Sequence, residues 1–484
     1  MLGPFLALLG LPQQHQDEDE DNPGRPTPPG AQARSQEQQA ESRRHQIERL
    51  AAYLHSAKVR PGTAKKIVES VRQVSEVVIW SDRHNTELLS LTVEVGLHQA
   101  MLGLLLLGRS AQQRSQAEGA VAVQILQTFS IILDSVTDTK FIYALLSNNF
   151  VNQLIAAPVD LENEEVLSYY IAFLKALSLR LTPSTIHFFF NELMDDFPLY
   201  TTAIAHFDHP DSMVRVAVRA ITLNVFRIND PDALEFILNA PACAHFWEQV
   251  VCTLRGTYDD AFRILVEILG GGSPTAPKAT TAVDSRTMTD VQGWAALDQV
   301  LEMHMGLLAY LSDILNLGVD RINQRVTDEF RDRILARTYV HAIEVGWRSG
   351  ASFEETLFMQ VVTLFLAHFF SIVRYSPLLV DTIVALFYVP GRSEPGDPSD
   401  DDKPRARLVH PFVPSPFESS RTLAPWLCVV LEILRNKAIS PTTLVKSVLT
   451  PRRMLRTRAL LESLTGSVSV DDCCSSMSNQ SALT

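Results

Sequence analysis

Apolar residues along most of the chain recur at the spacing of an α-helix. Ile67, Val71, Val74 and Val78 follow one another at intervals of four, three and four residues, which places their side chains on one helix face. The same pattern returns in the segments 121–133, 164–178 and 353–374, and almost no segment alternates as a β-strand does. The pattern therefore predicts an all-α protein.

Short turns separate the predicted helices. Asn148-Asn149, the segment 208–211 and Asn229-Asp230-Pro231 carry the Asn, Asp and Pro residues that are typical of helix ends. Helices joined by short turns pack as antiparallel neighbours, and a long run of such pairs forms a solenoid. The segment 211–219, DSMVRVAVR, has the character of the second helix of a HEAT repeat, although no strict period recurs elsewhere. We predict an irregular armadillo/HEAT-like α-solenoid.

Several segments lack the helical pattern and are rich in Pro, Gly, Ser or charged residues. We predict disorder in an acidic N-terminal segment, a flexible internal loop, a linker and a Ser-rich tail. These segments are residues 1–45, 270–290, 391–423 and 466–484. The ordered parts are then helices over 46–228, a continuing solenoid over 229–390 that contains the loop, and C-terminal helices over 424–465.

Composition narrows the class of protein. The net charge of −13 argues against a nucleic-acid binder, which needs a basic face. Five cysteines without a repeated spacing predict neither a disulfide framework nor a zinc site, and favour a reducing compartment. The apolar stretches Met101–Leu107 and Thr363–Ile372 are shorter than a bilayer-spanning helix, so we expect them to be buried. We find no nucleophile, phosphate-binding or metalloprotease motif and predict a protein that is not an enzyme and has no cofactor.

One long segment resembles a known family. Residues 145–228 include LLSNNFVNQLI, NEEVLSYYIAFLKALSLRL and, after Phe197-Pro198-Leu199, YTTAIAHFDHPDSMVRVAVRAITLNVFRI. This segment resembles the FPL domain, named after its Phe-Pro-Leu tripeptide, which defines the family of C-type lectin domain family 16 member A and plant Transparent Testa 9. The resemblance extends over about residues 63–390, and no lectin domain is present.

The resemblance implies a role in membrane traffic. The family is associated with transport from endosomes to lysosomes, with autophagy including mitophagy, and with Golgi or vacuolar sorting. It implies a cytoplasmic protein with peripheral association to endosomal, lysosomal or Golgi membranes. It also implies protein partners in tethering, autophagy or ubiquitin pathways. We therefore expect a non-catalytic helical scaffold or adaptor. The alternatives are a component of a ubiquitin-ligase complex and a generic cytosolic scaffold unrelated to membranes; the oligomeric state is left open.

Two groups of residues are candidates for partner binding. Phe197, Pro198 and Leu199 form either a docking motif or an apolar anchor at the first turn of a helix, where Pro is tolerated. Arg215 and Arg219 either bind an acidic peptide or lipid head group, or pair with carboxylates such as Asp208 and Asp211 to lock adjacent repeats.

The aromatic and histidine residues near these groups have a structural explanation as well as a functional one. Three consecutive Phe in the segment 187–192, HFFFNE, cannot share one helix face, so one of them is exposed unless helices flank both sides. His206, His209 and Asp211 are weak metal candidates, and we expect no metal there.

The C-terminal region contains a basic amphipathic segment. Residues 450–464, TPRRMLRTRALLESL, carry Arg452, Arg453, Arg456 and Arg458 among leucines. A helix of this kind can lie on an anionic membrane. The alternative is a capping helix with a solvated basic face.

Overall fold

The computed structural model describes residues 29–106, 115–270, 283–346, 350–387, 389–390, 406–407 and 420–443. The chain divides into two compact units, residues 1–145 and 146–484. Within the described ranges nearly every element is a helix. The exception is one pair of two-residue antiparallel strands, β1 (Val389–Pro390) and β2 (Ala406–Arg407). The predicted all-α class is confirmed.

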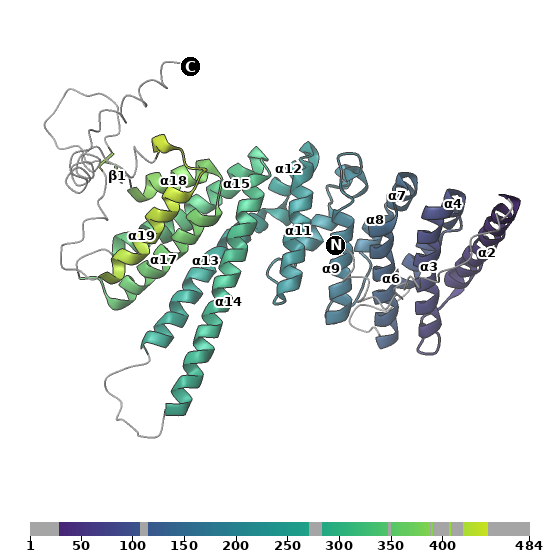
Figure 1. The fold of residues 1–484 in the computed structure, drawn as a ribbon, viewed down its shortest axis with the longest axis horizontal. Helices are drawn as coiled ribbons and strands as arrows, with labels where there is room; N and C mark the ends of the chain where they lie inside the picture. The colour runs from purple at the N-terminus through teal and green to yellow at the C-terminus, as the bar shows by residue number, and fades with distance from the viewer. Residues whose placement is uncertain are drawn as a thin grey trace, which may run out of the picture. The chain divides into compact units, whose positions relative to one another are not determined.

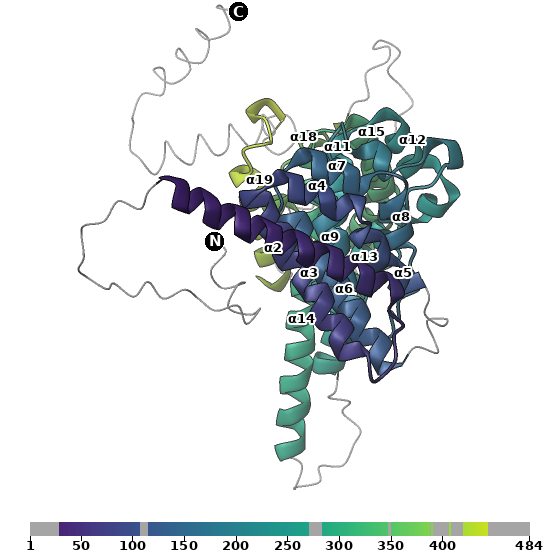
Figure 2. The ribbon, with the colours of Figure 1, turned by 90° about the vertical axis from the view of Figure 1, so that its right-hand side faces the viewer.

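The first unit is built from consecutive helices. They are α2 (Pro29–Ser56), α3 (Ala64–His84), α4 (Thr86–Glu94), α5 (Leu97–Leu106), α6 (Gln116–Ser135) and α7 (Thr139–Leu146), whose last residue belongs to the second unit. Helix α3 packs on α6, and α2 lies against α3 and α5 (Figure 2). The predicted face of α3 is its buried face, because Ile67 and Val71 have no exposed surface and Val74 and Val78 are at most 2% exposed.

Polar side chains set the ends of these helices. Asn85 caps α4 by accepting hydrogen bonds from the backbone N–H groups of Glu87 and Leu88. Ser115 and Glu118 form a capping box at the start of α6. The Asp82 carboxylate accepts bonds from the backbone N–H groups of residues 137 and 138, and so ties the end of α3 to the turn before α7.

Helix α2 differs from the expectation for the N-terminal segment. We expected disorder up to residue 45, whereas the helix begins at Pro29. The Gln, Ala, Glu and Arg residues of this stretch have high helix propensity. The buried Ile47, Leu50 and Leu54 attach the C-terminal half of α2 to the unit, so the helix extends upstream of its apolar contacts.

The second unit contains the remaining elements. They are α8 (Phe150–Ile155), α9 (Glu164–Ser178), the 3-10 helices η2 (Ile186–Phe188) and η3 (Glu192–Met194), α10 (Pro198–Ile204), α11 (Ser212–Ile228), α12 (Pro231–Asn239), α13 (Pro241–Gly270), α14 (Val283–Asn316), α15 (Asp320–Phe330), the π-helix η4 (Arg331–Val340), α16 (His341–Gly346), α17 (Phe353–Ile372), α18 (Ser376–Phe387) and α19 (Ser420–Arg435). Helix α11 packs on α9, α13 on α14, and α17 on α19 (Figure 1).

Two of these helices begin inside segments that we expected to be flexible. Helix α14 begins at Val283, within the predicted loop 270–290, and α19 begins at Ser420, within the predicted linker 391–423. The division into units also falls at Leu145 and Leu146, inside the segment that we had assigned to one helical domain over 46–228.

Among the residues that the structure describes, three segments are long and apolar enough, by length and composition, to cross a membrane. They are Thr86–Leu106, Gln116–Ser135 and Phe353–Ile372, with 21, 20 and 20 residues. Our expectation that the apolar stretches 101–107 and 363–372 are too short was therefore wrong. The first stretch belongs to a longer segment made of α4 and α5, and the second lies at the C-terminal end of the 20-residue helix α17. In the structure 61%, 44% and 56% of the respective apolar windows is buried against other helices.

Candidate interaction site

The Phe-Pro-Leu tripeptide lies in the core of the second unit. Phe197 is the N-cap residue of α10, Pro198 occupies the first turn, and Phe197, Leu199 and Tyr200 have no exposed surface. The Phe197 ring centroid lies 5.8 Å from that of Phe190 and 6.4 Å from that of Phe236. The tripeptide thus anchors the start of α10: the side chains of Phe197 and Leu199 present no surface to a partner, and Pro198 is half-buried.

The loop directly before the tripeptide is held in one conformation. The backbone N–H of Asn191 donates to the carbonyl of Asp196 over 2.9 Å, and the N–H of Asp196 donates back over 3.2 Å. The Asn191 side chain accepts a bond from the N–H of Met194, and Asp195 adopts the left-handed conformation with φ of 48°. Buried Phe190 and Phe197 flank both ends of the loop, so its tip is a rigid projection.

The tip presents apolar side chains to solvent. Leu193 is 97% exposed and Met194 is 74% exposed. Glu192, Asp195 and Asp196 around them are also exposed, and no ion pair neutralises them within the described ranges. We call residues 192–196 the acidic–apolar tip. Such a tip can enter an apolar pocket that has a basic rim.

The two candidate arginines have different environments. Arg215 donates from Nη1 to the backbone carbonyls of His209 and Pro210, at 2.7 and 2.6 Å, and so fastens the turn before α11. Arg219 lies over the rings of Phe207 and Tyr310, at 5.8 and 5.9 Å from their centroids. Its buried Nε has no hydrogen-bond partner among the described residues, and burial lowers the pKa of its guanidinium.

The expected carboxylate partners of the arginines are occupied elsewhere. Asp208 accepts bonds from the Gln249 and Thr253 side chains of α13, at 2.7 and 3.0 Å. Asp211 caps α11 by accepting from the N–H of Met213 over 2.8 Å. In the described structure the arginines therefore hold backbone carbonyls and aromatic rings, and form no ladder of ion pairs with Asp208 and Asp211.

The histidines near this turn also make local contacts. His206 hydrogen-bonds through Nδ1 to the carbonyl of Thr202, and His209 Nδ1 accepts from the N–H of Asp211. Over the ranges that the structure covers, no group of three or more His, Cys, Asp and Glu side chains is placed to hold a metal ion. In the aromatic segment 187–190, Phe189 and Phe190 are buried and Phe188 is half-buried.

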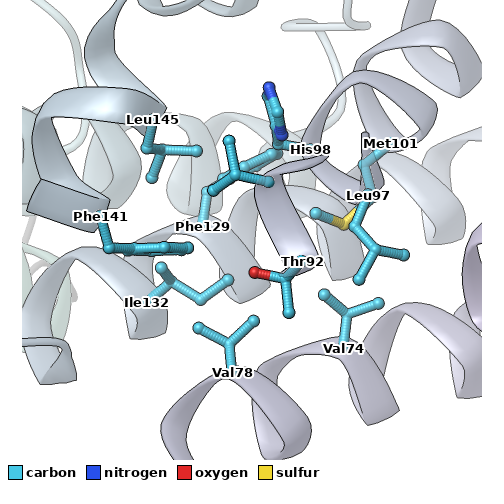
Figure 3. Close-up of a pocket in the computed structure, with 11 residues that line it drawn as sticks. Val74, Val78, Thr92, Leu97, His98, Met101, Phe129, Ile132, Phe141 and Leu145 are labelled. Carbon is cyan, nitrogen blue, oxygen red and sulfur yellow. The ribbon is translucent and has the colours of Figure 1, made fainter. Parts of the chain in front are cut away.

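A small apolar pocket lies within the first unit. Figure 3 shows its lining, which comes from α3 to α7 and includes Val78, Thr92, Met101 and Phe129. His98 is also part of the lining, and burial lowers its pKa. The pocket volume is about 20 Å³, which accommodates one water molecule and no cofactor.

The second unit buries a histidine among aromatic rings. His304 of α14 has no exposed surface, stacks on Phe365 at a centroid distance of 4.0 Å, and bonds through Nδ1 to the Thr257 hydroxyl at 2.9 Å. Because Thr257 donates its own proton to the carbonyl of Leu254, the Nδ1 of His304 carries the proton. Its Nε2 has no partner among the described residues. Burial, and secondarily the neighbouring His368, lowers the pKa of His304 to about 3.

Comparison with known families decides the identity of the central segment. Residues 71–226 match the family model FPL, whose description reads "Uncharacterised conserved protein". The chain carries an FPL domain. The predicted family is confirmed, and both the buried tripeptide and the acidic–apolar tip lie inside the FPL match.

Relatives of the FPL domain extend the similarity. Protein CLEC16A homolog of Drosophila melanogaster is 36% identical over 279 residues, which are 57% of this chain and 23% of the relative. Protein CLEC16A of Homo sapiens is 32% identical over 315 residues, 65% of this chain and 27% of the relative. Protein TRANSPARENT TESTA 9 of Arabidopsis thaliana is 28% identical over 265 residues, 54% of this chain and 29% of the relative. The matched part thus spans 23% to 29% of these relatives, and neither the FPL description nor these names is that of an enzyme.

The acidic–apolar tip of the FPL domain was missed by sequence reasoning. Leu193 and Met194 stand between Asn191 and two aspartates, and this isolated apolar pair in a polar turn is the signal that was available. The arginines of the predicted membrane-surface segment, Arg452, Arg453, Arg456 and Arg458, lie outside the described residues.

Proposed function

We propose that the protein is a non-catalytic helical scaffold or adaptor that acts through protein–protein contacts in membrane traffic and autophagy. In this proposal the helix pairs of each unit stack as an irregular solenoid, and the chain works in the cytoplasm at the surface of endosomes, lysosomes or the Golgi. The FPL domain and the similarity to Protein CLEC16A and TRANSPARENT TESTA 9 support the proposed role in membrane traffic and autophagy.

The acidic–apolar tip is the observation that carries the binding role. The transfer of a leucine or methionine side chain from water into an apolar environment is favourable, by about 1.5–3 kcal/mol for each fully buried side chain. Here the loop bonds and flanking Phe rings hold Leu193 and Met194 in solvent, at 97% and 74% exposure. Burial of these two side chains by a partner therefore stabilises the complex, and the complex does not have to offset the entropy cost of ordering the loop.

The chemistry of the tip identifies its partner class. Three exposed carboxylates surround the apolar pair, so an anionic membrane repels the tip and a basic rim attracts it. We therefore propose a protein partner with an apolar pocket bordered by Lys or Arg. The salt dependence of binding follows from the same charges, since salt screens exposed pairs.

A matched pair of variants tests this proposal. In the double variant Leu193→Ser/Met194→Ser, we expect full-length tagged protein to lose tethering or autophagy partners from affinity purification. The control Leu179→Ser/Met213→Ser removes side chains that are 61% and 74% exposed elsewhere in the same unit, and should retain them. Equal recovery from both variants would refute the role of the tip.

Imaging tests the cellular setting independently. We expect tagged wild-type protein to form puncta that overlap endosome, lysosome or Golgi markers. A uniformly diffuse or nuclear signal refutes the proposed association with membranes.

An autoubiquitination assay tests the non-catalytic role. Autoubiquitination by the purified chain refutes this role, because a scaffold alone should be inert.

A further inference from the structure

Arg219 is a half-buried cation without a counterion among the described residues. Its guanidinium lies over the rings of Phe207 and Tyr310, at 5.8 and 5.9 Å from their centroids. Within the described ranges it makes no ion pair and no hydrogen bond, and its Nε is buried, whereas Nη1 and Nη2 are not. Contacts with ring faces offset only part of the cost of taking a charge out of water. The outer edge of the guanidinium, with its two Nη atoms, is therefore left to bind an anion.

The neighbouring helix α14 leaves a notch beside this edge. Gly306 of α14 faces Arg219, and a Cβ atom at residue 306 would lie 3.2 Å from Nη1. Apart from the backbone of α14 and the two residues next to Gly306, no other atom of the described chain lies within 4 Å of that position. Glycine is a poor residue for the interior of a helix, but the side chain that it lacks leaves room for a small group such as a carboxylate.

The charges around the notch favour an anion with a single charge. Arg215, one turn earlier on α11, already donates from Nη1 to two backbone carbonyls. The carboxylate of Asp208 accepts hydrogen bonds from side chains of α13 and acts on Arg219 only at a distance. One available guanidinium near a fixed negative charge suits a carboxylate better than a doubly charged phosphate. We propose that Arg219 and the notch at Gly306 bind one carboxylate, which an Asp or Glu side chain of a partner protein supplies.

The surface next to the notch favours a protein as the source of the carboxylate. A single charge pair at a surface contributes little free energy, so a stable complex requires further contacts. Val216 is exposed and Leu223 is half-buried, three residues before and four residues after Arg219 on α11. At these spacings both are neighbours of Arg219 on the helix surface, and a partner chain can cover them while it places its carboxylate. The choice of a protein rests on the proposed scaffold function, whereas the carboxylate site itself does not.

Chemical modification tests carboxylate binding in the full-length chain. Phenylglyoxal modifies arginine side chains, and mass spectrometry of proteolytic peptides measures the rate at each arginine. In about 0.2 M acetate, Arg219 should react about threefold more slowly than in chloride of the same ionic strength, for a dissociation constant of about 0.1 M. The exposed Arg227 of the same helix is the internal control and should react equally in both salts. Equal rates at Arg219, or equal slowing at Arg227, overturn the site, and stronger protection by phosphate overturns the choice of a carboxylate.

A carboxylate built into the notch provides a second test. Because a Cβ atom at residue 306 would lie 3.2 Å from Nη1, the side chain of Gly306→Asp should pair with Arg219. In this variant the modification of Arg219 in chloride should be at least about threefold slower than in the wild type, and acetate should slow it no further. Gly306→Asn has the same size without the charge and should keep the acetate effect. Wild-type reactivity of Arg219 in Gly306→Asp refutes the notch as a carboxylate site.

Peptide selection tests the source of the carboxylate. A display library of random peptides, selected on the full-length wild-type chain, should yield peptides with an Asp or Glu that pairs with Arg219. Its replacement by Asn or Gln should weaken binding to the wild type at least about tenfold, and binding to Arg219→Gln by less than about twofold. If no selected peptide shows this coupling, a protein partner at this site is refuted. Leu193→Ser/Met194→Ser should change neither result, so this site and the acidic–apolar tip are tested separately.

Discussion

The buried histidine of α14 makes the second unit sensitive to acid. The pKa of His304 is about 3 in the folded protein and about 6.5 in an unfolded chain. Between these values the unfolded chain binds a proton that the folded chain does not. The contribution of neutral, buried His304 to the free energy of unfolding is therefore fully present above pH 6.5. It decreases as the pH falls below this value. From pH 7 to pH 5 the loss from this one side chain is about 2 kcal/mol.

The variant His304→Phe should remove this contribution. Its ring can keep the stack on Phe365, while the loss of the hydrogen bond to Thr257 costs about 1 kcal/mol at pH 7. Between pH 7 and pH 5 the free energy of unfolding should decrease less in the variant than in the wild type. The difference between the two decreases should be about 2 kcal/mol. Urea unfolding at both pH values measures the difference, and hydrogen exchange of the α14 amides assigns it to this unit.

An exposed histidine provides the control. His245 is 81% exposed, so His245→Phe should leave the pH dependence of stability unchanged. His368, whose pKa burial also lowers, keeps its own contribution in every variant and so cancels in the comparison. The reasoning is refuted if His304→Phe retains the full acid dependence of the wild type. His304 would then be protonated as readily in the folded protein as in the unfolded chain, which requires a hydrogen-bond acceptor for its Nε2.

Four further substitutions test other contacts. Phe197→Ala should lower the free energy of unfolding by about 3–5 kcal/mol, whereas Leu193→Ser should change it by at most about 0.5 kcal/mol; similar losses in urea unfolding would contradict the contrast between anchor and tip. Arg215→Ala should cost about 1–3 kcal/mol in thermal unfolding, because two backbone carbonyls lose a charged donor. Asn436→Asp keeps the shape but cannot donate to the two carbonyls at the end of α17; a loss of about 2 kcal/mol or more is expected in urea, and wild-type stability would refute the role of these bonds.

Helix faces and helix ends were the parts of the fold that the sequence revealed best. The α3 periodicity identified residues that are buried, because a repeating apolar position has meaning only against a packed neighbour. Asn229-Asp230-Pro231 marked a real boundary, where Asn229 takes a left-handed conformation and Asp230 caps α12. These signals are local, so a single chain segment contains them in full.

Contacts between distant segments could not be predicted in the same way. The carboxylate of Asp208 was an obvious partner for the arginines, yet it binds Gln249 and Thr253, more than 40 residues further along the chain. The rigidity of the acidic–apolar tip likewise depends on ring packing among Phe190, Phe197 and Phe236. No local pattern encodes which of several polar or aromatic neighbours a side chain meets.

The position of α3 has a practical consequence for anyone who prepares the FPL domain alone. The family match starts at Val71, whereas α3 starts at Ala64 and Ile67 is fully buried. A fragment trimmed to residues 71–226 would lose two turns from the helix that supports α6, and would end before α11 is complete. It would also cut across both compact units while completing neither. Useful fragments should instead begin before α2 and extend through α19.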